Sequence, residues 1–339
     1  MIIDVHGHYT SEPPQLAAFR AAQLARLVDP SLPVPELAPI SDDELRASIE
    51  QNQLRVLRAR GGDLMVLSPR ASAMGHHVPD PATARAWSAA SNDLVARIVG
   101  LFPEHFAGGC QLPQTPGGSV DDAVAELRRC VEVLGFVGCN LDPDPSGGYW
   151  SSPPLTDPSW FPLYEALVEL DVPAMVHVSG SCNPAAHTLG AHYLNADTTV
   201  FMQLLEGDLF IRFPGLRLVV PHGGGAVPYH WGRYRGLAAR AGRPDPSALL
   251  GNVFFDTCVY HQPGIDLLAK VVPLDNLLFA SEMLGAVRGA DPDTGVEWDD
   301  TRQYVEHLGL ADADRRRVFE GNARRVFPRL DARLSAAGR

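Results

Sequence analysis

The chain has 339 residues, of which 45% are hydrophobic and 20% are charged. This composition indicates a globular protein with a large core, and it excludes a disordered chain and a small disulfide scaffold. The formal net charge of −12 makes nucleic acid and anionic membranes poor partners, because both repel an acidic protein. An anionic small molecule would need a local cluster of arginines or a metal ion inside a pocket.

Short apolar segments alternate with helical patterns along the whole chain. Eight segments are predicted as strands, at residues 2–5, 64–67, 106–109, 138–141, 174–178, 216–220, 253–256 and 277–280. Most of them are continuous apolar runs, as strands buried on both faces require. Residues 41–44 form a capping box that opens a helix ending near Gly61, and further helices are predicted at 82–99, 120–134, 160–170, 199–208, 301–308 and 313–326.

Strands separated by helices predict one α/β domain over residues 1–339, a parallel (β/α)8 barrel with loop insertions near residues 10–40 and 142–158. A doubly wound open sheet is the alternative. Against it, no G-x-G-x-x-G follows the first strand and no G-x-x-x-x-G-K-[ST] occurs. The glycine run at 223–225 follows the sixth strand and lacks a lysine.

The cysteines and the hydropathy pattern add further expectations. The five cysteines, at positions 110, 130, 139, 182 and 258, are odd in number and form no C-x-x-C pair, which favours reduced thiols and a cytoplasmic protein. No apolar run approaches the roughly 18 residues that a membrane helix needs. The N-terminal segment lacks the basic flank of a signal peptide, so we expect the functional chain to begin at Met1.

A polar residue stands just past nearly every predicted strand. In chain order these residues are His6 and His8, Ser68 and Arg70, Gln111, Asp142 and Asp144, His177 and Ser179, His222, Asp256 and Thr257, and Ser281 and Glu282. In a barrel all of these positions converge at the C-terminal mouth, where barrel enzymes carry their active sites.

Four of these residues predict a metal centre. His6 and His8 are two apart on an extended segment, so both imidazoles point to the same side. His177 ends the fifth strand, and the carboxylate of Glu282 is costly to bury unless it is paired or bound to a metal. Three imidazoles and one carboxylate suit Zn²⁺ with an open position for water, with Mn²⁺ as the alternative.

Further residues near the mouth are candidates for catalysis and substrate binding. His222 has the chemistry of an acid, a base or an electrophile, or it orients another group. Arg70 suits a carboxylate clamp, with a salt bridge at the rim as the alternative. The loop after the fifth strand adds candidates for acid or base catalysis, which are Cys182, His187 and Tyr193. The remaining candidates are predicted to bind substrate: His76, His192, Ser281, Arg233 and Arg288.

The motifs carry a family resemblance. His6-Gly7-His8, His177, the string PHGGG at 221–225 and the closing string GNARRVF at 321–327 resemble the amidohydrolase superfamily in its decarboxylase-like branch. Within that branch, MIIDVHGHYT at 1–10, DPDPSGG at 142–148, FFDTCVYHQPGI at 254–265 and LFASEMLGAVR at 278–288 are similar to the 4-oxalomesaconate hydratases. The resemblance covers nearly the whole chain.

That resemblance implies a distorted (β/α)8 barrel of the metal-dependent hydrolase type and a single Zn²⁺. It also implies hydration of a carbon–carbon double bond in a tricarboxylic acid from meta-cleavage of protocatechuate or gallate. Carried over by position, the ligands are His6, His8, His177 and Glu282, and Glu282 fits the general base as well. The implied partner is a small polycarboxylate, and a homodimer is expected.

One position departs from the family. Ala185 stands in the loop after the fifth strand, where the resemblance leads us to expect a second cysteine placed as a general acid. The proton for the carbanion then comes from Cys182, His187, Tyr193 or water, or else the substrate differs from that of the family.

Three rival functions stay open at this point. A metal-dependent decarboxylase of the same branch would use similar ligands. A lactone or amide hydrolase would use metal-activated water and usually an aspartate after the eighth strand, so Glu282 counts against it. A binding module that has lost catalysis is disfavoured by the complete set of metal ligands.

Overall fold

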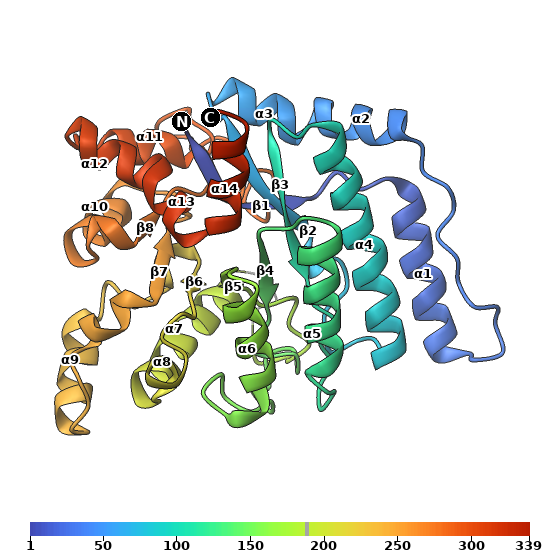
Figure 1. The fold of residues 1–339 in the computed structure, drawn as a ribbon, viewed down its shortest axis with the longest axis horizontal. Helices are drawn as coiled ribbons and strands as arrows, with labels where there is room; N and C mark the ends of the chain where they lie inside the picture. The colour runs from blue at the N-terminus through green and yellow to red at the C-terminus, as the bar shows by residue number, and fades with distance from the viewer. Residues whose placement is uncertain (187–189) are drawn as a thin grey trace.

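The computed structural model describes residues 1–186 and 190–339. Eight parallel strands follow one another in chain order, and each pairs with its neighbour in the sequence (Figure 1). They are β1 (Ile3–Tyr9), β2 (Leu64–Pro69), β3 (Phe106–Gln111), β4 (Gly138–Leu141), β5 (Ala174–Val176), β6 (Leu218–Val220), β7 (Val253–Asp256) and β8 (Leu277–Leu278). The predicted barrel is confirmed, and the doubly wound sheet is excluded because its strand order would reverse at a switch point.

The seam between the last strand and the first is closed by single hydrogen bonds. The amide of Val5 donates to the carbonyl oxygen of Phe279 at 3.1 Å. The amide of Glu282 donates to the carbonyl oxygen of His6 at 2.9 Å. The buried carboxylate of Asp4 joins the same two segments, since it accepts from the amides of His6 and Ser281. The seam therefore fixes the residues around His6 against those around Glu282.

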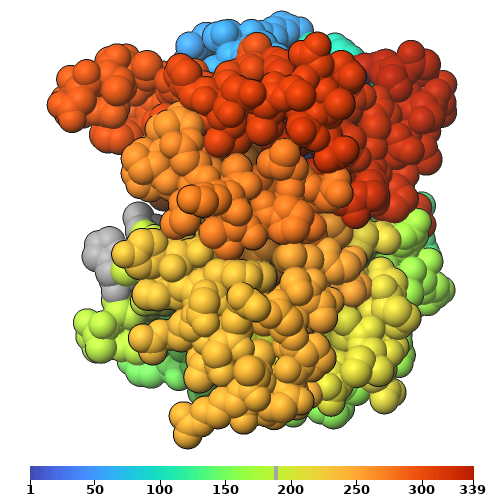
Figure 2. Space-filling view, turned by 90° about the vertical axis from the view of Figure 1, so that its left-hand side faces the viewer, coloured from blue at the N-terminus to red at the C-terminus, as the bar shows by residue number. Residues whose placement is uncertain are grey.

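Helices surround the barrel, as Figure 1 shows. They are α1 (Pro14–Val28), α2 (Asp42–Gln51), α3 (Gln53–Ala59), α4 (Pro81–Leu101), α5 (Asp121–Arg128), α6 (Phe161–Glu169), α7 (Ala191–Glu206), α8 (Leu209–Arg212), α9 (Trp231–Arg240), α10 (Gln262–Val271), α11 (Thr301–Glu306), α12 (Asp312–Arg316), α13 (Asn322–Val326) and α14 (Pro328–Ala336). In Figure 2, α9 lies on the outer surface, at the lower front of the molecule.

Several predicted boundaries differ from the structure for identifiable reasons. The first strand extends through His6 and His8 to Tyr9. These polar side chains do not end the strand, because both imidazoles have polar partners inside the protein. The helix that begins at the confirmed Ser41 capping box breaks at Asn52, whose backbone leaves helical geometry. Helix α1 occupies part of the insertion near residues 10–40, with a proline at its first helical position.

The core has two layers. Inside the barrel, apolar side chains fill the amino-terminal ends of the strands and continue into α13 and α14, which close this end; we call it the base. A larger apolar layer lies between the strands and the surrounding helices. The five cysteines are all unpaired. Among the described residues, no helix combines the length and the apolar character that a bilayer span requires.

Candidate metal centre and active site

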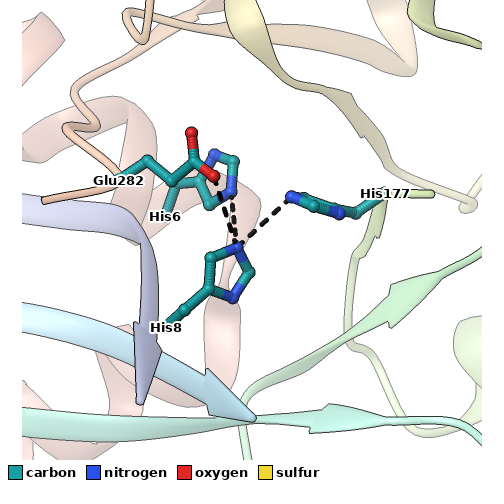
Figure 3. Close-up of side chains that lie close together, drawn as sticks. All are labelled: His6, His8, His177 and Glu282. Carbon is teal, nitrogen blue, oxygen red and sulfur yellow. Dashed lines mark hydrogen bonds and ion pairs between the residues drawn. The ribbon is translucent and has the colours of Figure 1, made fainter. Parts of the chain in front are cut away.

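Three imidazoles meet inside the carboxyl-terminal ends of the strands, which we call the mouth. The Nε2 atoms of His6 and His8 are 3.1 Å apart, and those of His8 and His177 are 3.3 Å apart. Figure 3 shows His8 at the centre of this cluster. All three rings are buried, so the sequence-predicted histidines from β1 and from the end of β5 do come together.

Hydrogen bonds on the outer side fix which nitrogen of His6 and His177 carries the hydrogen. Nδ1 of His6 lies 2.8 Å from Oδ2 of Asp256, and Nδ1 of His177 lies 2.8 Å from the carbonyl oxygen of Val178. Burial alone would raise the pKa of Asp256, but the hydrogen bond from His6, the nearby imidazoles of His6 and His222 and the amide of Cys258 together outweigh burial and lower that pKa. Both partners are acceptors, so each Nδ1 donates and each Nε2 presents a lone pair.

His8 is oriented in the same way by a serine. Its Nδ1 lies 2.9 Å from the hydroxyl oxygen of Ser68, and that hydroxyl donates to the carbonyl oxygen of Gly7 at 3.1 Å. Because the hydroxyl hydrogen is already used, Ser68 must accept from His8, and Nε2 of His8 is left with its lone pair. Burial lowers the pKa of His8 to about 3 and lowers that of His177 far below its usual value.

Glu282 completes the cluster from the segment after β8. Its Oε1 lies 3.9 Å from Nε2 of His8, and its Oε2 lies 3.7 Å from Nε2 of His222 and 3.2 Å from the hydroxyl of Tyr260. Burial opposes the charged carboxylate, but His222 and the neighbouring imidazoles outweigh burial and hold the pKa of Glu282 below its usual range. Glu282 is therefore ionised.

The residues of this cluster fit a divalent cation. Three lone pairs and one carboxylate oxygen converge within 4.8 Å of one another, and without a cation between them the nitrogen lone pairs would repel one another in a buried site. Imidazole nitrogens and a carboxylate are ligands that Zn²⁺ and Mn²⁺ both accept.

His222 lies beside the cluster and has its own carboxylate. Its Nδ1 is 2.9 Å from Oδ2 of Asp197 on α7. Burial opposes the imidazolium form, but Asp197 and Glu282 outweigh burial and raise the pKa of His222 well above its usual value. The ring of Tyr193 stacks on that of His222, with the centroids 5.7 Å apart and the planes at 11°.

A cavity opens above the cluster and contains two arginines. It is lined by His8, Thr10, Arg70, Ala71, Ser72, His177, Tyr193, Glu282, Gly285, Ala286 and Arg288. Arg70 comes from the loop after β2 and Arg288 from the segment after β8. This is the arrangement that a substrate with several carboxylates needs, because each guanidinium can hold one carboxylate in two hydrogen bonds.

A second, larger hollow lies on the side of β3 and β4. It is bordered by Gln114, Thr115 and Trp160, and the described residues that line it include no charged or metal-binding side chain. Of these two hollows, it is the smaller cavity above the histidine cluster whose described lining includes charged and metal-binding side chains.

Besides His6 and His222, which belong to or adjoin the histidine cluster, five sequence-predicted candidates lie outside the set of described residues that line this cavity. Cys182 is exposed, with its thiol against the carbonyl oxygen of Gly147. His192 is buried on α7. Arg233 is exposed on α9.

The other two are paired with buried carboxylates of the protein. The hydroxyl of Ser281 donates to the carboxylate of Asp4. His76 is buried, and its Nδ1 lies 2.8 Å from Oδ2 of Asp142. The position of His187, which the sequence offered as a possible acid, lies outside the described residues.

Three residues of the site were not assigned a role from the sequence: Asp197, Asp256 and Tyr260. Asp256 was visible as a polar residue at the end of a strand, and this signal could have marked it as a partner for a ligand. Asp197 lies within a helix and Tyr260 within a loop, and neither position carries a local pattern that indicates which side chain it contacts.

Comparisons with known proteins agree with this geometry. The chain matches the model of the family described as "Amidohydrolase" over residues 3–329. It is 59% identical, over 347 aligned positions, to the 2-keto-4-carboxy-3-hexenedioate hydratase of Sphingobium sp. strain NBRC 103272 / SYK-6, with 100% of this chain and 99% of the relative covered.

Two solved structures are similar to this chain, one at high and one at low sequence identity. The 4-oxalomesaconate hydratase from Rhodopseudomonas palustris shares 55% identity and a TM-score of 0.92, with 100% of this chain and 99% of that chain covered. A dihydroxybenzoic acid decarboxylase from Polaromonas sp. JS666, solved with bound manganese and an inhibitor, shares 20% identity and a TM-score of 0.67, with 96% of each chain covered. The second likeness concerns the fold alone.

Proposed function

This chain belongs to the amidohydrolase family, and on that premise we propose that the mouth of its barrel is the active site of a metal-dependent hydratase. The reaction adds water to the carbon–carbon double bond of 4-oxalomesaconate in the degradation of protocatechuate or gallate by meta-cleavage. The observation that carries the proposal is the buried cluster of three histidines and Glu282 beneath a cavity with two arginines, in a chain similar over its full length to two hydratases.

The substrate's structure explains what the site must do. In 2-keto-4-carboxy-3-hexenedioate, the substrate in one relative's name, the double bond between C3 and C4 is conjugated to the carbonyl at C2. Water therefore adds at C4, and the negative charge that develops is shared with the carbonyl oxygen as an enolate. A proton must then be delivered to C3, and three carboxylates must be held throughout.

We assign the cation to His6, His8, His177 and Glu282, with Zn²⁺ as the proposed metal and Mn²⁺ as the alternative. When bound, such a cation supplies a Lewis acid that stabilises negative charge on oxygen and lowers the pKa of water. Burial favours the neutral forms of His8 and His177, and a hydrogen bond at Nδ1 orients each of the three rings.

Glu282 is the proposed general base that takes the proton from the attacking water. It is ionised, and its Oε2 lies beside His222, whose Nδ1 faces Asp197. Because Asp197 stabilises the imidazolium form of His222, the ring of His222 places a positive charge next to Glu282. A general base in such a position contributes about 100- to 10,000-fold to a rate.

Tyr193 is the proposed donor of the proton to C3. It lines the cavity, and burial raises the pKa of its hydroxyl to about 12, so the hydroxyl keeps its hydrogen at neutral pH. Cys182 remains the second candidate, although it is exposed and is not among the described residues that line the cavity. Arg70 and Arg288 bind the substrate carboxylates, with Thr10 and Ser72 as neighbouring hydroxyls.

The test is to incubate the metal-loaded enzyme with 4-oxalomesaconate and to follow the conjugated chromophore together with the mass of the product. Hydration predicts loss of the chromophore and a gain equal to one water molecule, whereas a decarboxylase would release the mass of carbon dioxide. Enzyme treated with a chelator is the control. Its activity should disappear and should return on addition of Zn²⁺ or Mn²⁺. Loss of carbon dioxide would show that the chain is a decarboxylase.

A further inference from the structure

Three residues in an unusual backbone conformation meet at one carboxylate. His222, Tyr260 and Glu282 have φ angles of 52°, 63° and 49°, in the left-handed region that is unfavourable for residues other than glycine. The side chains of His222 and Tyr260 both approach Oε2 of Glu282, at 3.7 Å and 3.2 Å. The surrounding structure therefore maintains backbone strain at the points that place groups around this carboxylate.

The hydroxyl of Tyr260 has one hydrogen and two acceptors within reach. These are Oε2 of Glu282 at 3.2 Å and the carbonyl oxygen of Ser281 at 3.1 Å. An ionised carboxylate is a stronger acceptor than a neutral carbonyl. As long as Glu282 is charged, the hydrogen of Tyr260 is therefore directed to Oε2.

The loop that carries Tyr260 is fixed against the segment that carries Glu282. The hydroxyl of Thr257 donates to the carbonyl oxygen of Ala280 and accepts from the amide of Ala280, both at 2.9 Å. This reciprocal pair sets the loop after β7 in register with the segment after β8. The contact between Tyr260 and Glu282 therefore depends on the pairing of the two segments that follow adjacent strands of the barrel.

The two oxygens of Glu282 have different surroundings. Oε1 faces the histidine cluster, 3.9 Å from Nε2 of His8, whereas Oε2 faces Tyr260 and His222. We propose that Tyr260 is a positioning residue that holds Oε2, so that the carboxylate of Glu282 cannot rotate and Oε1 stays directed at the cation site. The kinetic part of this inference rests on the proposed function, and the metal-binding part does not.

The direct test is Tyr260→Phe, which removes the hydroxyl and keeps the ring. Partners of metal ligands typically contribute 10- to 100-fold to metal affinity or activity, and we expect a loss of that size in affinity for Zn²⁺, in kcat, or in both. Affinity is measured by competition with a chelator in the absence of substrate. KM should change little, because Tyr260 is not among the described residues that line the cavity.

Tyr164→Phe is the matched control. Tyr164 is a buried tyrosine, whereas Tyr260 is partly buried, and the hydroxyl of Tyr164 donates to the carbonyl oxygen of Leu155 at 2.6 Å on the outer side of the barrel. This variant should keep the wild-type metal affinity and kcat. If Tyr164→Phe loses as much as Tyr260→Phe, the effect is general destabilisation and the proposal is overturned.

A double variant tests whether Tyr260 acts through Glu282. In a Glu282→Gln background, the further change Tyr260→Phe should have no effect on metal affinity, because the charged oxygen it holds is gone. Independent, additive losses would contradict the proposal, as would a folded Tyr260→Phe enzyme with wild-type kcat and metal affinity. If the wild-type enzyme fails to hydrate 4-oxalomesaconate, the proposed function fails while the affinity measurements still decide the role of Tyr260.

Discussion

At the base of the barrel, the interior is filled by Ile3, Leu64 and Val219, which pack against Val326 and Leu330 of the closing helices. At the mouth, the interior of the same barrel holds three histidines, a glutamate and a set of aspartates. Side chains at the base need only to fill volume, and several apolar residues could do so. Each polar group at the mouth needs a specific partner, because a buried polar group without one is costly.

The difference shows how a single barrel separates stability from chemistry. Substitutions at the base are expected to change the free energy of unfolding and to leave the reaction intact. Substitutions at the mouth are expected to change the reaction and to leave the fold intact, because the strands are already held by the base and by the outer helical layer.

The largest expected effect comes from Glu282→Gln at the mouth. The amide keeps the size of the side chain but cannot take a proton from water, so kcat should fall by about 100- to 10,000-fold. The circular dichroism spectrum should remain that of the wild-type enzyme. Wild-type kcat in a metal-loaded variant would eliminate Glu282 as the base.

The matched change at the base is Glu320→Gln. Glu320 accepts from the N-terminal ammonium at 2.9 Å and from Arg324 at 2.8 Å, far from the histidine cluster in the fold. Its kcat should equal that of the wild type. A large loss of kcat here would show that the two ends are not independent.

An intermediate effect is expected from Leu330→Ala at the base. Leu330 is fully buried in α14 among the side chains that close the barrel. Its truncation removes apolar contacts and leaves a cavity, which should lower the free energy of unfolding by about 2–5 kcal/mol. Denaturant titration measures the loss, and kcat per folded molecule should be unchanged below the transition.

Ile211→Ala is the control for that measurement. Ile211 is 82% exposed, so its truncation should change the free energy of unfolding by no more than about 0.5 kcal/mol. If Ile211→Ala lowers the free energy of unfolding as much as Leu330→Ala does, burial at the base does not explain the destabilisation in Leu330→Ala.

The smallest expected effect is a pH dependence at the rim of the mouth. Burial raises the pKa of Glu12 to about 7 from 4.5, against the opposing charges of Arg20 and Arg70. Between pH 4.5 and about pH 7, Glu12 keeps its proton in the folded chain and loses it in the unfolded chain. The free energy of unfolding therefore falls as pH rises from 4.5 to 7, by about 3 kcal/mol at most.

Glu12→Gln removes this contribution. The difference in the free energy of unfolding between wild type and variant, measured by denaturant titration at a series of pH values, should shift in favour of the variant as pH rises. If the difference in the free energy of unfolding stays constant across this pH range, the pKa of Glu12 is not raised by folding. Any pH dependence of stability then comes from other groups.

Much of the mouth was accessible from sequence because its signals are local. His6 and His8 share a side of one strand by the two-residue period of extended backbone, and each apolar strand run is followed by a polar residue. The capping box at Ser41 likewise depends on neighbours within four positions. By contrast, α1 escaped prediction because its segment was assigned to a loop insertion near residues 10–40, although proline at the first helical position favours a helix.

What the sequence determined by itself was the strand order of the barrel and the side chains that would reach its mouth, because strand periodicity and the positions of strand ends are properties of adjacent residues. Only the tertiary structure decided which groups meet there. Asp256 contacts His6 across 250 positions of the chain, and Asp197 contacts His222 from a neighbouring helix. Such pairs depend on how the strands are staggered around the closed barrel and on the conformation of the loops between them. Local sequence patterns record neither of these.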